Sequence, residues 1–252
     1  MPRFHDHDAG GPAALLERKA ALRRRVWRRL DIAGIRRFPG PLGRIPNFVG
    51  AEKAAERLRD SEPWQAAETV KANPDSPQWP VRQRALEDGK LLFMAVPRLA
   101  QENPFFVLDP EALEGTPRQA SSIKGASASA ITVPLEAMRP VDLVVTGCVA
   151  VDEGGGRLGK GGGFSDLEFA LASAAGMIGA QTRIVTTVHE EQVVDAGEIP
   201  MSSHDVPLDL IVTPERVIAC GGDHRRPASL QWETLTEKKI AAIPLLARLR
   251  PT

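Results

Sequence analysis

The sequence predicts an α/β protein, a three-layer sandwich with helices on both faces of a mostly parallel central sheet. Short, continuous apolar runs bounded by breakers are typical of strands buried on both faces. Four such runs occur, at residues 91–96, 141–147, 183–188 and 208–214. Between the second and third runs, residues 164–180 have the apolar spacing of a packed helix. Strand, loop, helix and strand in this order predict a βαβ unit.

The first part of the chain is predicted to be helical. Residues 1–12 are polar and glycine-containing, and we expect a disordered tail there, followed by one domain over residues 13–252. A helix is expected from Ala13 to about Leu30, with Leu15, Leu16, Leu22, Val26 and Leu30 on one face. A loop rich in Gly and Pro follows over 40–48, and then a second helix over 51–60.

The ends of two later helices are also marked in the sequence. Gly179 is expected to close the helix at 164–180. The tail at 230–250 has a helical pattern that contains Pro244, so a helix that is kinked or restarted there is expected.

Composition excludes several classes of protein. Lys and Arg together number 32 and balance 32 Asp and Glu, so net charge favours no particular partner. No apolar run approaches the roughly 20 residues that a membrane helix needs, and no secretory signal is recognisable, so a cytoplasmic protein is expected. The two cysteines, Cys148 and Cys220, lie in apolar settings and are expected to be buried thiols.

One stretch departs from the even charge balance. Residues 18–37 contain nine basic residues and one acidic residue. This pattern indicates either a solvated helix face or an anion-binding face.

The most informative segment is RLGKGGGFSDLE, residues 157–168. Its glycine loop, residues 159–163, leads into the predicted helix, where unpaired N–H groups and the helix dipole favour an anion. Arg157 and Lys160 are expected to flank this concavity, and Asp166 in the first helical turn could hold Mg²⁺ beside a phosphate. The alternative is a glycine-rich surface hairpin without a ligand.

The loop does not fit two familiar phosphate-binding motifs. A Walker A loop requires Lys-Ser/Thr after its last glycine, but Gly163 is followed by Phe164. The glycines are also too dense for a dinucleotide fingerprint. Two histidines are further candidates: His204 beside Asp205 could form an acid/base pair or a turn, and His189 follows a predicted strand.

Four motifs together resemble the 5-formyltetrahydrofolate cyclo-ligase, or methenyltetrahydrofolate synthetase, family. They are KAALR at 19–23, GCVAVD at 147–152, RLGKGGG at 157–163 and HDVPLDLIVTPERVI at 204–218. The resemblance implies Mg²⁺- and ATP-dependent cyclisation of 5-formyltetrahydrofolate to 5,10-methenyltetrahydrofolate, with release of ADP and phosphate. It implies ATP and a reduced folate as ligands of a monomer or small homo-oligomer.

The resemblance also implies roles for particular residues. Lys160 and Arg157 would be catalytic, Asp166 would hold Mg²⁺, and an apolar strip near Phe105 and Phe106 would hold the pterin. The nucleotide would be held by seven residues of the first helix and the loop: Lys19, Arg23, Gly159, Gly161, Gly162, Gly163 and Phe164.

The segment after the loop departs from the family pattern. The family usually has two aromatics, aspartate and then arginine, whereas this chain has Phe164, Ser165, Asp166 and Leu167. GKGGGFSDLEFA, with RIPNF and IPLLARLR, is similar to the methenyltetrahydrofolate synthetase domain-containing subgroup, here without the RNA-recognition domain of its animal members.

Three functions are therefore compared. The first is an ATP-dependent ligase acting on a reduced folate, and the second is a nucleotide- or folate-binding module of the same fold without turnover. RNA binding through residues 18–37 is the third and least favoured, and it would be marked by a steep dependence on salt.

Overall fold

A computed structural model describes residues 11–222, 224–227 and 230–250. Its centre is an eight-stranded sheet in the order β11-β10-β8-β5-β1-β2-β3-β4. The five strands from β10 to β2 are parallel neighbours, and the antiparallel strands β11, β3 and β4 lie at the two edges. The strands are β1 Thr69–Ala72, β2 Leu91–Ala95, β3 Phe105–Leu108, β4 Ile131–Val133, β5 Leu143–Val145, β8 Arg183–Thr187, β10 Leu210–Val212 and β11 Val217–Ala219.

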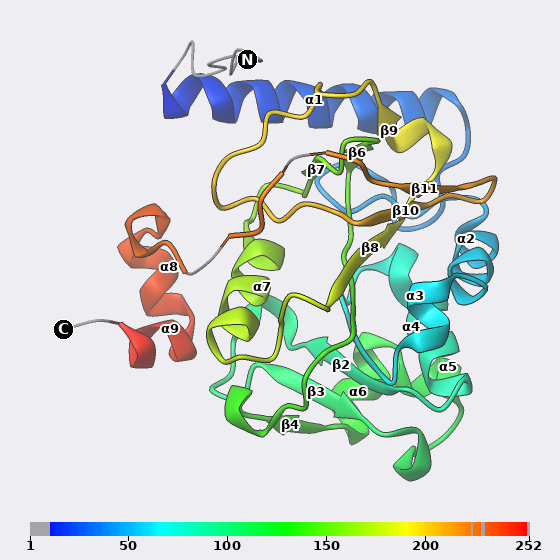
Figure 1. Cartoon of the computed structure of the whole chain (residues 1–252), viewed down its shortest axis with the longest axis vertical. Helices are drawn as coiled ribbons and strands as arrows, with labels where there is room; N and C mark the ends of the chain where they lie inside the picture. Colours follow the sequence, from blue (N-terminus) through cyan, green and yellow to red (C-terminus); the bar gives the residue numbers. More distant parts are fainter. Residues whose placement is uncertain (1–10, 223, 228–229, 251–252) are drawn as a thin grey trace.

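Helices cover both faces of this sheet, which confirms the predicted three-layer architecture (Figure 1). One face packs on α7, α8 and α9, and the other on the helices from α2 to α6. Alternate residues along each strand enter the two core clusters, as in β5, where Val144 faces α7 while Leu143 and Val145 face away from it. The helices are α1 Pro12–Ile32, α2 Ala51–Arg59, α3 Glu62–Ala66, α4 Trp79–Glu87, α5 Pro117–Ala120, α6 Ile123–Ser129, α7 Phe164–Ala174, α8 Glu237–Ala242 and α9 Pro244–Leu249.

The four predicted strands correspond to β2, β5, β8 and β10, and the βαβ unit is β5-α7-β8, whose strands pair in parallel. The strand β1 was not predicted, because it is short and carries Lys71 among its four residues. Ile243 separates α8 from α9, so the helix restarts at Pro244 as expected. None of the described helices has the length and apolar character that crossing a membrane requires.

The predicted end of the helix at 164–180 is wrong. The helix α7 ends at Ala174, and Gly176, not Gly179, closes it with a φ of +74°. The N–H of Gly176 donates to Ser173 O and that of Met177 to Ala172 O, the two bonds of a Schellman motif.

The helix α1 runs across the top of the molecule in Figure 1, beside a second, small sheet. Its buried residues are Lys19, Leu22, Val26 and Leu30, whereas Leu16, expected on this face, is 65% exposed and Leu15 is half-buried. The disordered tail predicted for residues 1–12 lies mostly in residues 1–10, which are outside the described residues. At the end of this predicted tail, the structure already begins α1 at Pro12.

The small sheet was not predicted; two of its strands come between β5 and the glycine loop in the sequence, and the third follows β8. Its order is β7-β6-β9, with β6 Ala150–Asp152, β7 Arg157–Leu158 and β9 Val193–Val194. The glycines at 154–156 make the turn of the β6–β7 hairpin, where Asp152 accepts the N–H of Gly156. The loop at 159–163 is a separate feature that connects β7 to α7.

Both cysteines are free thiols. Cys148 is buried as expected, while Cys220 is half-buried. Burial raises the pKa of both thiols, that of Cys220 to about 12.

Candidate functional site

The order of the central strands locates a topological switch point. The chain passes from β1 to β2 in one direction along the sheet, whereas β5, on the other side of β1, leads through β8 to β10 in the opposite direction. In open α/β sheets, ligands bind outside the carboxyl ends of the strands where this direction reverses. Here that point lies between β1 and β5, where Asn73 and Asp75 follow one strand and Thr146 and Gly147 follow the other.

The glycine loop and the start of α7 are tied to this point by side chains. Ser165 Oγ lies 2.8 Å from Thr146 Oγ1 and accepts a hydrogen bond of 3.3 Å from Asn73 Nδ2. Lys160 Nζ donates to Asp75 Oδ1 at 2.9 Å. The loop therefore closes over the carboxyl ends of β1 and β5, although β7 rather than β5 directly precedes it.

The backbone of the loop offers a run of hydrogen-bond donors. Among the described residues, no acceptor is found for the N–H groups of residues 160–166. The last of these belong to the first turn of α7, whose dipole adds a favourable potential for an anion. The side chain of Arg23 on α1 donates from Nε to Gly159 O at 2.6 Å and fixes the start of the loop.

Arg157 lies beneath the loop, not at its rim. The residue is 3% exposed, and its guanidinium donates to Asp166 Oδ1 at 2.5 Å and to Thr146 Oγ1 at 2.9 Å. Burial alone would lower the pKa of Arg157, but the attraction of Asp166 outweighs it and raises this pKa above its ordinary value. The structure thus gives Arg157 a holding role, and its catalytic role stays a prediction, as does that of Lys160.

Asp166 has one oxygen free for a metal. Its Oδ1 accepts from Arg157 and, at 3.3 Å, from the N–H of Val206. Its Oδ2 has no hydrogen-bond partner among the described residues. The described residues also contain no group of three or more His, Cys, Asp or Glu side chains suited to a metal. Mg²⁺ is commonly held by one or two carboxylates together with phosphate and water oxygens, so the single free oxygen fits that mode of binding.

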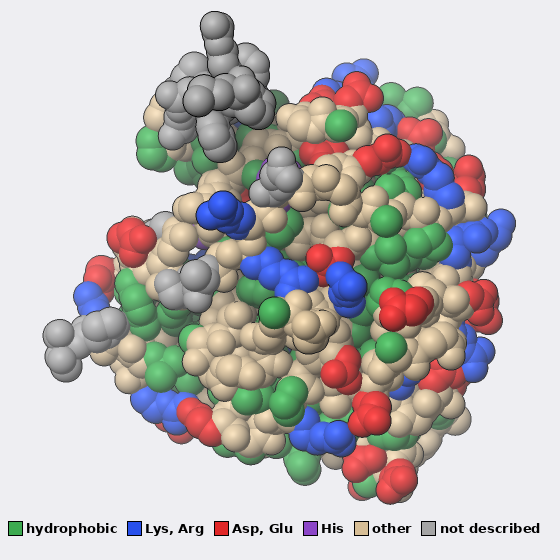
Figure 2. All heavy atoms as spheres, in the orientation of Figure 1, with side chains coloured by type: hydrophobic (Ala, Val, Ile, Leu, Met, Phe, Trp, Pro, Cys, Tyr) green, Lys and Arg blue, Asp and Glu red, His purple; other side chains and the backbone are tan. Residues whose placement is uncertain are grey.

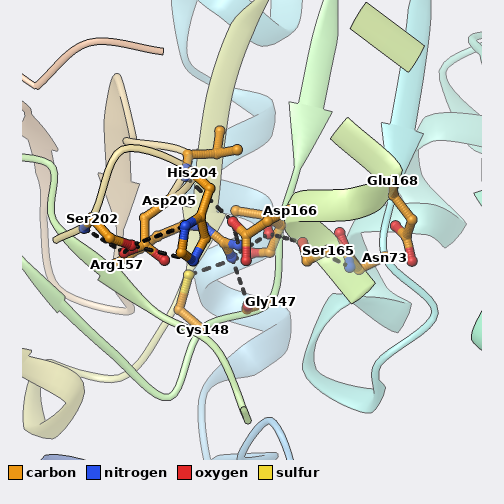
Figure 3. A network of polar contacts seen from close by, with 12 residues as sticks. Asn73, Gly147, Cys148, Arg157, Ser165, Asp166, Glu168, Ser202, His204 and Asp205 are labelled. Carbon is orange, nitrogen blue, oxygen red and sulfur yellow. Dashed lines mark hydrogen bonds and ion pairs between the residues drawn. The ribbon is translucent and has the colours of Figure 1, made fainter. Parts of the chain in front are cut away.

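A second ion pair, that of Lys19 and Asp205, lies beside the pair of Arg157 and Asp166. The ammonium of Lys19 is ion-paired with Asp205, which also accepts the N–H and the hydroxyl of Ser202. Burial would raise the pKa of Asp205, but Lys19 and Ser202 outweigh it and lower this pKa below its ordinary value. Hydrogen bonds join Asp166, Arg157, Thr146, Ser165 and Asn73 into one polar network, and Asp205 lies beside it (Figure 3).

The two candidate histidines, His204 and His189, have different surroundings in the structure. His204 is exposed and contacts Ser202 Oγ, so it does not form an acid/base pair with Asp205. His189 lies at the carboxyl end of β8 and accepts the N–H of Glu191 through Nδ1. Phe105 and Phe106 are 0% and 4% exposed and lie in the cores on opposite faces of the sheet, so they offer no surface to a pterin.

Comparison with known proteins identifies the family and the fold. A model of the 5-formyltetrahydrofolate cyclo-ligase family matches residues 15–214, which include α1, the glycine loop and Asp205. The chain belongs to the 5-formyltetrahydrofolate cyclo-ligase family. This finding confirms the resemblance that the four sequence motifs predict.

Within the cyclo-ligase family, the chain is similar to two groups of proteins. It is 38% identical over 235 residues to the methenyltetrahydrofolate synthase domain-containing protein of Mus musculus, covering 92% of this chain and 63% of that protein. It is 33% identical over 86 residues to the 5-formyltetrahydrofolate cyclo-ligase of Mycolicibacterium smegmatis, covering 34% and 40% of the two chains. This chain therefore spans slightly less than two thirds of the length of the mouse relative.

The fold of the cyclo-ligase family is also found in a solved structure. The NMR structure of 5,10-methenyltetrahydrofolate synthetase from Aquifex aeolicus has a TM-score of 0.51, with 21% identity, over 86% of this chain and 97% of that one. At this identity the likeness concerns the fold.

The sequence pattern pointed to the residues on α1 and the glycine loop but missed those at the ends of the strands. Asn73 and Asp75 lie in the run NPD directly after β1. A polar cluster of this kind after a strand is the signal that could have found them, but β1 itself was not predicted.

Proposed function

We propose that this protein is a Mg²⁺- and ATP-dependent ligase that converts 5-formyltetrahydrofolate, or a closely related formylated folate, to its cyclic methenyl product. The observation that carries the proposal is the run of N–H groups at residues 160–166 that have no acceptor within the described part of the chain, at the switch point of the sheet. Family membership supplies the reaction class.

Each residue of the site would have a separate role in binding MgATP. The N–H groups of the loop would hold the phosphates of ATP, with Lys160 supplying positive charge at the rim. Asp166 Oδ2 would hold Mg²⁺, which neutralises phosphate charge when bound. Arg157, paired with Asp166 and bonded to Thr146, would keep this carboxylate in place.

The reaction transfers one phosphoryl group and closes one ring. The formyl oxygen attacks the γ-phosphorus of ATP, and ADP leaves. A neighbouring N–H nitrogen of the folate then attacks the activated formyl carbon and releases its proton to solvent, and the C–O bond breaks as phosphate departs. Such a transfer depends on positioning and on charge neutralisation, which the loop is suited to provide.

The direct test is to mix the protein with 5-formyltetrahydrofolate and MgATP, and to follow methenyl absorbance together with phosphate release. Equal amounts of product and phosphate are expected. ATP binding without product would contradict the ligase and leave a nucleotide-binding module. Absence of both binding and product would contradict the nucleotide site itself.

The metal role of Asp166 predicts a specific effect of Asp166→Asn. Loss of the carboxylate should weaken the binding of ATP with Mg²⁺ on the order of tenfold more than the binding of ATP without Mg²⁺. The reason is that only the binding of MgATP uses Asp166 Oδ2. The variant should also unfold more easily, since removing one partner of a buried ion pair costs about 3 kcal/mol or more. Calorimetric titrations with and without Mg²⁺ make the comparison, and equal losses would leave Asp166 only as the partner of Arg157.

A further inference from the structure

The two C-terminal helices lie outside the residues that the family model matches, yet they pack on the helix that follows the glycine loop. The family model ends at residue 214, whereas α8 and α9 span 237–249. Figure 1 shows both on the outer side of α7. Ile240, Ile243, Leu245 and Leu246 are buried in the same core cluster as Leu167 and Leu171 of α7.

This packing directs one charged side chain at the loop. Lys239, in the first turn of α8, donates from Nζ to Gly162 O at 3.0 Å and lies 5.2 Å from the centre of the Phe164 ring. Its backbone N–H donates to Thr236 Oγ1, which caps the helix and fixes the position of the residue. The Nζ also lies 3.0 Å from where a Cβ on Gly163 would be, so the close approach depends on that glycine.

The surroundings of this ammonium favour a negatively charged ligand. Burial lowers the pKa of Lys239, and attraction to Asp166 opposes the shift. Within the described residues, the ammonium has a carbonyl and an aromatic ring as direct contacts but no carboxylate at ion-pair distance. A partly desolvated cation without a paired carboxylate gains energy when an anion binds beside it.

The bond to Gly162 O also orients the loop. A trans peptide directs its C=O and its N–H to opposite sides. Because the carbonyl of Gly162 points at Lys239, the N–H of Gly163 in the same peptide points the other way. Arg23 acts in the same manner on Gly159 O and the N–H of Lys160. Two cations from helices at opposite ends of the chain therefore hold two carbonyls of the loop.

We propose that Lys239 is a positioning residue of the phosphate site, and that the C-terminal helices α8 and α9 are a working part of that site. Lys239 fixes the Gly162–Gly163 peptide with its N–H available to a phosphate oxygen, and adds a positive charge at the loop. This inference rests on the proposed function, since it assumes that the loop binds the phosphates of a nucleotide.

The test compares Lys239→Met with Lys238→Met in the full chain. Lys238 is the neighbouring lysine, exposed and without a described contact, so its loss should change nothing. MgATP and inorganic tripolyphosphate are titrated into each variant by calorimetry. Lys239→Met is expected to weaken both ligands by about tenfold, because a charge-assisted hydrogen bond is lost, while Lys239→Arg retains most of the affinity.

A second measurement separates positioning from general stability. In the wild type, the amide resonance of Gly163 should shift when tripolyphosphate binds, and Lys239→Gln, which keeps a donor for Gly162 O, should retain most of that shift. If Lys239→Met does not fold, a Gly163 resonance unaffected by tripolyphosphate in the wild type would overturn the inference.

The outcomes are distinguishable. If the wild type binds neither MgATP nor tripolyphosphate, the proposed function fails and the inference with it. If the wild type binds both and folded Lys239→Met binds them equally well, the inference alone is overturned. Loss of affinity in Lys239→Met with normal binding in Lys238→Met supports it.

Discussion

Lys71 is a charged residue in the middle of the central sheet. It occupies β1 with 2% of its side chain exposed, on the face that packs against α7, and its ammonium is ion-paired with Glu168. It also lies 3.4 Å from Asn73 Oδ1, so the pair joins the polar network at the carboxyl end of β1. The pair couples β1, at the switch point of the sheet, to the helix after the glycine loop.

This pair predicts a strong non-additivity in stability. Lys71→Met should cost about 3–5 kcal/mol, because it leaves the carboxylate of Glu168 buried and unpaired. The double variant Lys71→Met, Glu168→Leu should recover most of that loss, since two apolar side chains replace both charges. Urea unfolding measures both values.

The matched control for this cycle is Lys53→Met on the exposed side of α2, which should change the free energy of unfolding by less than about 0.5 kcal/mol. A double variant no more stable than the single one would contradict the pairing.

Gly161 is a residue of the loop whose backbone conformation disfavours a side chain. Its φ is +104°, whereas Gly159 has ordinary φ and open space around its Cα. Gly161→Ala should therefore force the loop out of shape and weaken ATP binding by about tenfold, given that such a conformation costs an L-residue about 1–2 kcal/mol. Gly159→Ala is the control and should bind ATP like the wild type. Calorimetric titration measures both ATP affinities, and equal affinities of the two variants would contradict a role of the loop in ATP binding.

At the scale of elements, short connections after the parallel strands surround the switch point of the sheet. The turn after β1 is held by Arg82 of α4, which is 2% exposed and donates to the carbonyls of Asn73, Asp75 and Ser121. Burial lowers the pKa of Arg82 to about 10. Since a single buried guanidinium satisfies three carbonyls, α4 determines where Asn73 and Asp75 lie.

The short helix η5, Glu190–Gln192, is held after β8 by His189. The neutral imidazole accepts the N–H of Glu191, and Phe48 packs edge-on against the ring. Burial lowers the pKa of His189, against the attraction of Glu191, Glu215 and Glu190. Between the lowered folded-state pKa and the ordinary histidine pKa of about 6.5, the unfolded chain binds a proton that the folded chain does not.

The free energy of unfolding should therefore fall as the pH drops through about 6.5, and level off below the lowered folded-state pKa. His189→Asn keeps an acceptor without titrating, so this part of the pH dependence should disappear. Urea unfolding between pH 5 and 8 tests it, with exposed His204→Asn as the control. A slope unchanged in His189→Asn would show that another group causes it.

At the scale of the whole molecule, six of the nine basic side chains at 18–37 are ion-paired with carboxylates. The ion pairs are Lys19–Asp205, Arg24–Glu17, Arg25–Glu198, Arg29–Glu191, Arg36–Asp31 and Arg37–Glu52. Figure 2 shows basic and acidic side chains interspersed over the visible face. This arrangement favours a solvated helix face over a surface for nucleic acid.

RNA binding should accordingly be weak. A protein that neutralises many phosphates shows a steep fall of affinity with salt, and no such slope is expected here. Binding of a fluorescent single-stranded RNA at 50 and 200 mM salt provides the measurement. Micromolar affinity at low salt that drops by about a thousandfold would contradict this prediction.

What the sequence determined by itself is local. Apolar runs predicted four strands, the helical spacing predicted α1, α2 and α7, and Pro244 predicted the break between α8 and α9, because these patterns depend on neighbours within a few residues. The motifs were sufficient for the family, and they placed Lys19, Arg23 and the loop glycines in the candidate site. Short or polar elements such as β1 and the β6–β7 hairpin lack such periodicity and were missed.

What only the tertiary structure decided is which charges meet. Arg157 looked like a residue at the rim of the loop, but the fold buries it against Asp166. Lys71 finds Glu168 across 97 residues of sequence, and Lys239 reaches Gly162 across 77. These pairings depend on strand order and on the docking of α7 and α8, which no local pattern encodes, because a charged side chain carries no mark of its partner until the layers of the fold bring the two together.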